Sequence, residues 1–127
     1  LLAWDGAMAA PSVAAGVYAE WERAMVRRAT DRLVPEAARP YLRAVSLSRL
    51  VDWCARPAAA PPGLFYAASD SLRPDTAARR AGRDAFLAKT LGDAVAELDG
   101  RLGGDLARWR YGQARYKHAL VRHPLSE

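Results

Sequence analysis

Apolar residues recur at helical spacing in three stretches of the chain. The stretch from Pro11 to Thr30 predicts a first helix, because an apolar residue at every fourth position returns to one face. Pro11 suits the first turn, where its missing N–H costs nothing. The apolar face comprises Val13, Ala14, Val17, Tyr18, Trp21 and Met25, whereas Glu20, Glu22, Arg23, Arg27 and Arg28 fall mostly on the other side.

A second helix is expected from Pro40 to Ala55, and a third from Asp75 to Leu98. Both carry an apolar stripe at helical spacing. Gly100, Gly103 and Gly104 supply stop signals after the third helix. The two stripes are Leu47, Leu50, Val51 and Cys54 in the second helix, and Leu87, Leu91, Val95 and Leu98 in the third.

The stretch between these two helices, residues 56–75, predicts a loop because its prolines and Gly63 interrupt regular structure. We expect Leu64, Phe65 and Tyr66 to lie against a core surface. No long stretch alternates apolar with polar residues, so strands are short at most. The sequence therefore predicts a mainly α fold, and its 127 residues suit one domain rather than two.

The charge of the chain raises the question of an acidic partner. A net charge of +5 and a pI near 9.9 would suit nucleic acid or anionic lipid. However, Lys89 and Lys117 are the only lysines among 19 basic residues, and GC-rich coding DNA explains this arginine and alanine bias more simply. No apolar run approaches the length of a membrane span. We therefore expect neither nucleic acid nor a membrane as partner.

The two histidines do not form a metal-binding pattern. His118 and His123 are five positions apart, so on a helix they would not share a face. No cysteine lies near them, and the first carboxylate after them is Glu127. Both histidines are therefore expected to be structural, and no metal or cofactor is predicted.

The candidate nucleophiles also lack the context that catalysis needs. No serine lies in a G-x-S-x-G elbow. Cys54 falls on the apolar stripe of the second helix, where a thiol is usually inert. Asp5 precedes Gly6, a position more typical of a turn or cap than of a general acid or base. No catalytic residue is predicted in this chain.

Two blocks of the sequence together resemble a known family. "LLAWDGAMAAPSVAAGVYAEW" is similar to the W-D-G turn and following helix of the penicillin acylases, the penicillin amidase family of N-terminal nucleophile hydrolases. "LGGDLARWRYGQARYKHALVRHPL" resembles their L-G-x-D-x-x-x-W-x-[WY]-G pattern with a His-Pro-Leu ending. Pro11 and Arg115 depart from the residues usual in the family. The matching residues are Trp4, Asp5, Gly6, Tyr18 and Trp21, then Leu102, Gly103, Asp105, Trp109, Tyr111 and Gly112, and finally His123, Pro124 and Leu125.

The resemblance implies an enzyme that hydrolyses linear amides, such as the side-chain amide of β-lactam antibiotics or the amide of acyl-homoserine lactones. In the family, a precursor cuts itself and the new N-terminal serine of the large subunit attacks the amide, with its own α-amino group as base. An asparagine side chain and a backbone N–H stabilise the oxyanion. This chain contains no asparagine and no Gly-Ser junction. We therefore transfer no catalytic residue onto it.

These points imply that residues 1–127 are a single helical segment of a penicillin-acylase-like large subunit, within a larger four-layer αββα hydrolase, and without a complete catalytic domain. Its partners would be the rest of the same precursor and a small N-acyl amide substrate. The family further implies a periplasmic or secreted bacterial protein. Trp109 and Tyr111 would be buried anchors, and Gly112 would allow a close turn.

An alternative interpretation is a free-standing basic helical module that binds nucleic acid or a protein partner. The C-terminal basic stretch, with Trp109, Tyr111 and Tyr116, could stack bases and neutralise phosphates. It would then bind nucleic acid tightly, with an affinity that falls steeply as salt rises. A charge run is more often a solvated face, which favours the amidase interpretation.

Overall fold

The computed structural model describes residues 1–66 and 75–112. Within these ranges the chain forms three α-helices and three short 3₁₀ helices, and no strand. The mainly α fold expected from the sequence is therefore confirmed. The α-helices are α1 (Val13–Leu33), α2 (Leu47–Ala55) and α3 (Thr76–Leu102), and the 3₁₀ helices are η1 (Glu36–Ala38), η2 (Pro57–Ala59) and η3 (Leu106–Arg108).

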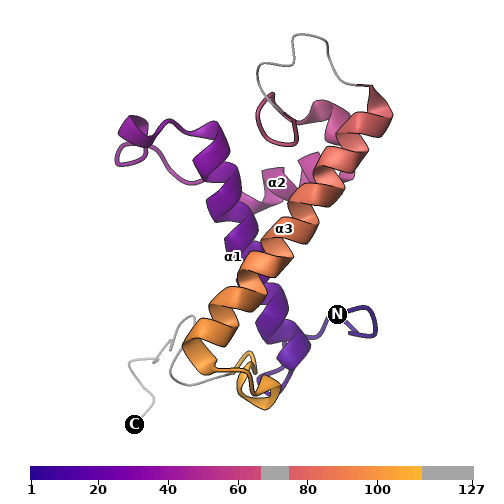
Figure 1. The fold of residues 1–127 in the computed structure, drawn as a ribbon, viewed down its shortest axis with the longest axis vertical. Helices are drawn as coiled ribbons and strands as arrows, with labels where there is room; N and C mark the ends of the chain where they lie inside the picture. The colour runs from indigo at the N-terminus through magenta and orange to yellow at the C-terminus, as the bar shows by residue number, and fades with distance from the viewer. Residues whose placement is uncertain (67–74, 113–127) are drawn as a thin grey trace, which may run out of the picture.

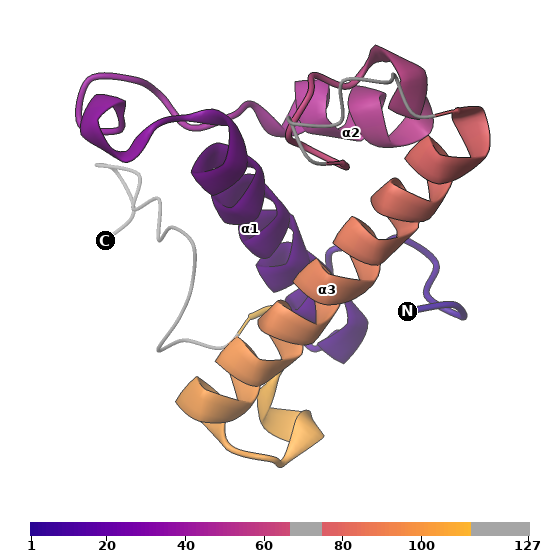
Figure 2. The same ribbon diagram turned by 45° about the horizontal axis from the view of Figure 1, so that its top comes forward.

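The two long helices, α1 and α3, cross near their middles and make the main packing contact of the molecule (Figure 1). The C-terminal end of α1 and the N-terminal end of α3 diverge beyond the crossing, and α2 lies on that side of the molecule (Figure 2). None of the helices in the described ranges has the length and apolar character that a membrane span requires.

One apolar core fills the space between α1, α2 and the start of α3. Leu50, Leu64 and Phe86 are fully buried at its centre. Phe65 packs edge-on against Phe86, with ring centroids 5.5 Å apart. Gly82 permits this contact, because a Cβ there would lie 2.1 Å from the Phe65 carbonyl oxygen. The expectation that the loop residues 64–66 lie against the core is confirmed, with Leu64 and Phe65 buried and Tyr66 partly buried against it.

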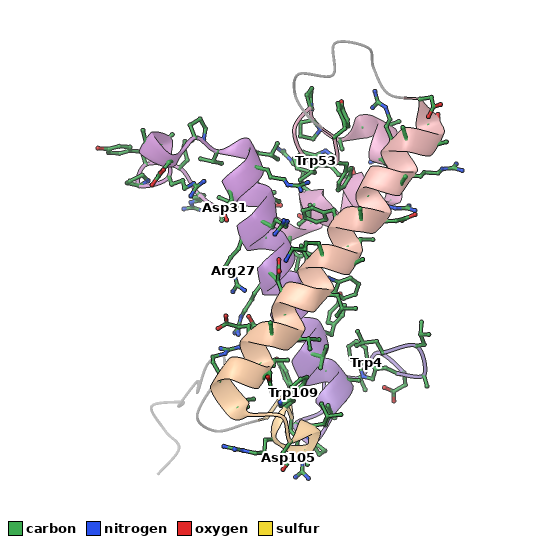
Figure 3. All side chains as sticks on the ribbon, viewed as in Figure 1. Trp4, Arg27, Asp31, Trp53, Asp105 and Trp109 are labelled. Carbon is green, nitrogen blue, oxygen red and sulfur yellow. The ribbon has the colours of Figure 1, made fainter. Side chains whose placement is uncertain are left out.

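A second, smaller core closes the opposite end of the molecule. Leu98 and Leu102 of α3 pack with Trp109, and the half-buried Val13 and Val17 of α1 cover them. Figure 3 shows Trp109 beneath the last turn of α3, close to where α1 begins. This core attaches the segment after α3 to the start of α1.

Leu98 of α3 is buried as expected, but the rest of the expected stripe lies one position after the residues that are buried. The buried positions are Phe86, Thr90, Ala94, Leu98 and Leu102, whereas Val95 is 39% exposed. Leu87 and Leu91 are only partly buried. The hydroxyl of Thr90 makes this register possible. It donates to the Phe86 carbonyl and accepts from the Trp21 indole, so a polar side chain is buried without losing hydrogen bonds.

The expected helix boundaries need correction at their starts. Pro11 precedes α1 rather than opening it, because Ser12 is the N-cap and its hydroxyl accepts from the Ala15 N–H at 3.1 Å. The second helix begins at Leu47, not Pro40, because Ser46 caps it in the same way. Val51 of that helix, expected in the core, is 52% exposed.

The third helix ends later than expected. It passes through Gly100 and stops after Leu102, where Gly103 takes a positive φ of 78°. Only glycine adopts that backbone conformation without strain. The extra turn carries Leu102, which is buried in the second core.

Candidate functional site

The W-D-G block forms a closed turn in front of α1. The Asp5 carboxylate accepts a hydrogen bond from the Ala7 N–H at 2.9 Å, and the Trp4 indole donates to the Ala7 carbonyl at 3.0 Å. Gly6 between them has a positive φ of 83°. The sequence-based interpretation of Asp5 as a turn residue is therefore confirmed, and its carboxylate is engaged in structure.

A row of aromatic rings connects this turn to both long helices. The Trp4 ring lies 5.1 Å from Tyr18, and Tyr18 lies 6.4 Å from Trp21, edge to face. The Trp21 indole donates to the Thr90 hydroxyl of α3 at 3.0 Å. A hydrogen bond with Glu22, as the main cause, and burial, as a second cause, raise the pKa of the Tyr18 phenol above its ordinary value.

The second block wraps around the end of α3. Asp105 opens η3, where its carboxylate accepts from the Ala107 N–H at 3.0 Å. Trp109 is 5% exposed, and its indole donates to the Gly103 carbonyl at 2.8 Å. Trp109 is thus the buried anchor that the sequence predicted, whereas Tyr111 is only half-buried.

The two blocks meet in space although most of the chain separates them. The Tyr111 N–H donates to the Ser12 carbonyl at 3.0 Å, and the Gly112 N–H donates to the Ala10 carbonyl at 2.7 Å. A Cβ at Gly112 would lie 2.5 Å from the Cβ of Ala10, which confirms the close approach expected there. We call this contact the block junction.

A buried carboxylate lies beside the block junction, on α1. Glu20 is 3% exposed and binds three arginines, Arg23 at 3.1 Å, Arg27 at 3.3 Å and Arg101 of α3 at 2.6 Å. The sequence analysis placed Glu20 on the outward face, which is wrong. The spacing of Glu20 to Arg23 indicates a local ion pair. The partner on α3, which makes burial possible, leaves no local signal in the sequence.

A groove of about 500 Å³ runs along α1 next to the block junction. Tyr111 and Met8 line one part of it and Leu47 another, and Arg27, on the outer side of α1 in Figure 3, contributes to its charged edge. No serine, cysteine or histidine is among its described lining residues, so these residues can bind an apolar group but offer no nucleophile. The remaining lining residues are Ala19, Glu22, Arg23 and Val26.

The candidate nucleophiles have structural tasks where the structure describes them. The hydroxyls of Ser12 and Ser46 cap helices, and Ser48 hydrogen-bonds to Ser46 at 3.0 Å. Cys54 is half-buried, and burial raises the pKa of its thiol, which disfavours the nucleophilic thiolate. The described residues contain no group of three or more His, Cys, Asp or Glu that could hold a metal ion. His118, His123, Arg115, Tyr116 and the His-Pro-Leu ending lie outside the described residues.

Comparison with known proteins identifies one family. The family model described as penicillin amidase matches residues 1–127, which includes both blocks and all the helices between them. Comparisons with curated proteins and with solved structures give no match.

Proposed function

The chain belongs to the penicillin amidase family, and on that premise we propose that the protein carrying it is an amidohydrolase that cleaves linear acyl amides. Its substrates would be β-lactam antibiotics with an acylated side chain or related N-acyl compounds such as acyl-homoserine lactones. The family match over both sequence blocks is the observation that supports this proposal.

The reaction would use residues outside this chain. An N-terminal serine would attack the carbonyl carbon while its α-amino group takes the hydroxyl proton. The C–N bond then breaks, the amine leaves with that proton, and water hydrolyses the acyl-enzyme. An asparagine would stabilise the oxyanion. Residues 1–127 contain no asparagine and no Gly-Ser pair, and none of the described serines is placed as a nucleophile.

The proposed task of residues 1–127 is to form one helical segment of the large subunit. The block junction supports this, because it fastens the segment after η3 to the start of α1 through two backbone hydrogen bonds. The chain would thereby leave its helices at a fixed place and direction. Its partners would be the rest of the same precursor and the N-acyl amide substrate, and the protein would be periplasmic or secreted in a bacterium.

A comparison of the full-length protein with the isolated chain tests the proposal. Both are incubated with a chromogenic phenylacetyl amide and a chromogenic long-acyl amide. We expect saturable hydrolysis by the full-length protein, loss of that hydrolysis when the N-terminal serine of its large subunit is replaced by alanine, and no turnover by residues 1–127. Turnover by the isolated chain, or a serine variant with unchanged activity, would contradict the proposed mechanism.

A further inference from the structure

A hollow of about 680 Å³ lies between η2 and the start of α3, remote from the block junction. Four arginines line it, and no carboxylate is among its described lining residues. We call it the arginine hollow. Its lining comprises Arg56, Arg79, Arg80 and Arg83 together with Ala55, Pro57, Ala58, Ala59 and Thr76.

Two of the four guanidinium groups are held in place by the backbone of the facing segment. Arg83 donates to the Cys54 carbonyl at 3.3 Å, and Arg79 donates to the Ala58 carbonyl at 3.0 Å. The Arg79 guanidinium also lies 5.2 Å from the centre of the Tyr66 ring. These contacts fix the position of positive charge at the wall of the hollow, so little side-chain entropy would be lost when a ligand binds.

The other two arginines extend from the rim towards solvent. The Arg80 side chain is exposed and makes no hydrogen bond or ion pair with the described residues. Arg56 is 68% exposed and pairs with Asp52 one helical turn before it. Both side chains can therefore turn towards a ligand without breaking a contact with the core.

The charges around the arginine hollow do not balance. Among the described residues, four guanidinium groups are offset by three carboxylates, namely Asp52 paired with Arg56, Asp84 paired with Arg83 at 2.7 Å, and Asp75 at the start of α3. The first turn of α3 also reaches the hollow through Thr76, although the Asp75 carboxylate caps the Ala78 N–H there. Like charges in one hollow repel each other, and a bound anion would relieve that repulsion.

From this arrangement we propose that the arginine hollow binds a small solute that carries a phosphate group. The described residues leave an excess of positive charge at the hollow, which favours an anion. The planar guanidinium fork also fits phosphate oxygens in bidentate fashion. This site is separate from the proposed amide hydrolysis and does not depend on it.

Calorimetric titration of the full-length protein with inorganic pyrophosphate, at low salt in a chloride buffer, tests the proposal. We expect one binding site per chain, and an affinity about tenfold or more weaker in the Arg56→Gln/Arg80→Gln double variant, because hydrogen bonds to a charged ligand are lost. The control is Arg43→Gln/Arg110→Gln, which removes the same charge from exposed positions outside the hollow. Its affinity should stay within about twofold of the parent, as a distant screened charge contributes little.

Equal weakening in both double variants would overturn the proposal, because it would show only attraction to overall positive charge. Absence of pyrophosphate binding to the parent protein would overturn it as well. Circular dichroism of the Arg56→Gln/Arg80→Gln variant should match the parent, because both side chains are exposed and neither contributes to the apolar core.

Discussion

Glu20 shows how a single residue can join two helices through charge. Its carboxylate is almost fully buried, while its three arginine partners remain 30% to 53% exposed. Burial of one ion is costly unless its partners and hydrogen bonds replace the lost water. Arg101 connects α3 to this carboxylate, so the cluster stabilises the crossing of α1 and α3 near the block junction.

We expect Glu20→Gln to lower the free energy of unfolding by about 1–3 kcal/mol, because it leaves three arginines facing a neutral group while solvent screens part of their repulsion. Urea denaturation measures the change. Glu36→Gln is the matched control, since Glu36 is exposed in η1 and its substitution should change stability by less than about 0.5 kcal/mol. Equal effects of the two substitutions would show that the Glu20 cluster contributes nothing specific.

Asp93 of α3, which pairs with Arg28 of α1, makes the stability of the fold depend on pH. A hydrogen bond from Lys89, and further attraction to Lys89 and Arg28, lower the pKa of this carboxyl below its ordinary value of 3.8. A carboxyl with a lowered pKa stabilises the fold above its unfolded pKa, and this contribution is lost as the pH falls through the folded pKa. We expect Asp93→Asn to be less stable than the parent at pH 7, with the difference shrinking as the pH falls below 3.8. Urea titrations across this pH range measure it, and a difference that is constant with pH would contradict the assignment.

At the scale of elements, the register of α3 depends on one hydroxyl. Thr90 accepts from Trp21 at 3.0 Å and donates to the Phe86 carbonyl at 2.9 Å. Valine has nearly the same shape without the hydroxyl, so Thr90→Val leaves the N–H of the half-buried Trp21 without its acceptor. We expect a loss of about 1–3 kcal/mol in the free energy of unfolding. Val95→Thr, on the exposed face, should change it by less than about 0.5 kcal/mol. Thermal and urea unfolding both measure these values. An unchanged free energy of unfolding in Thr90→Val would show that the hydroxyl does not stabilise this register.

Local sequence signals predicted the helices, but not which face of α3 is buried. Periodicity indicated three helices, and turn residues such as Gly103 and Pro57 indicated where they end, because these are local properties of the chain. The choice of Thr90 and Ala94 over Leu91 and Val95 for the buried face depended on the partner helix. Trp21 supplies the hydrogen bond to Thr90, and its position relative to α3 has no local signal.

The functional features likewise divide into those with a local signal in the sequence and those that depend on tertiary packing. The turn at Asp5, the anchor Trp109 and the close approach at Gly112 could be predicted, because residue type and family resemblance both indicated them. The buried Glu20 and the arginine hollow could not. Each combines residues from two elements, Glu20 with Arg101 and Arg56 with Arg80, whose distances are determined only by tertiary packing.

At the scale of the whole molecule, the chain is fastened at both ends of its helix crossing. The larger core joins α2 and the loop residues 64–66 to α1 and α3, while the block junction and the smaller core join the segment after α3 to the start of α1. Both attachments rely on a glycine that lets a backbone carbonyl approach a helix, namely Gly82 for Phe65 and Gly16 for Trp109. The direction in which the chain leaves Gly112 therefore depends on close contact with α1.

Gly16 provides a direct test of this dependence. Alanine favours an α-helix over glycine by about 0.5–1 kcal/mol, so Gly92→Ala in α3, where a Cβ would meet nothing within 4 Å, should raise the free energy of unfolding by that amount. At Gly16 a Cβ would lie 1.9 Å from the Trp109 carbonyl oxygen, and a backbone atom cannot move aside without displacing the block junction. We expect Gly16→Ala to lower the free energy of unfolding by about 1–3 kcal/mol despite the gain in helix propensity. Urea denaturation compares the two variants. Stabilisation by both substitutions would show that the segment after η3 does not need its contact with α1, and the proposed task of the junction in directing the chain would then fail.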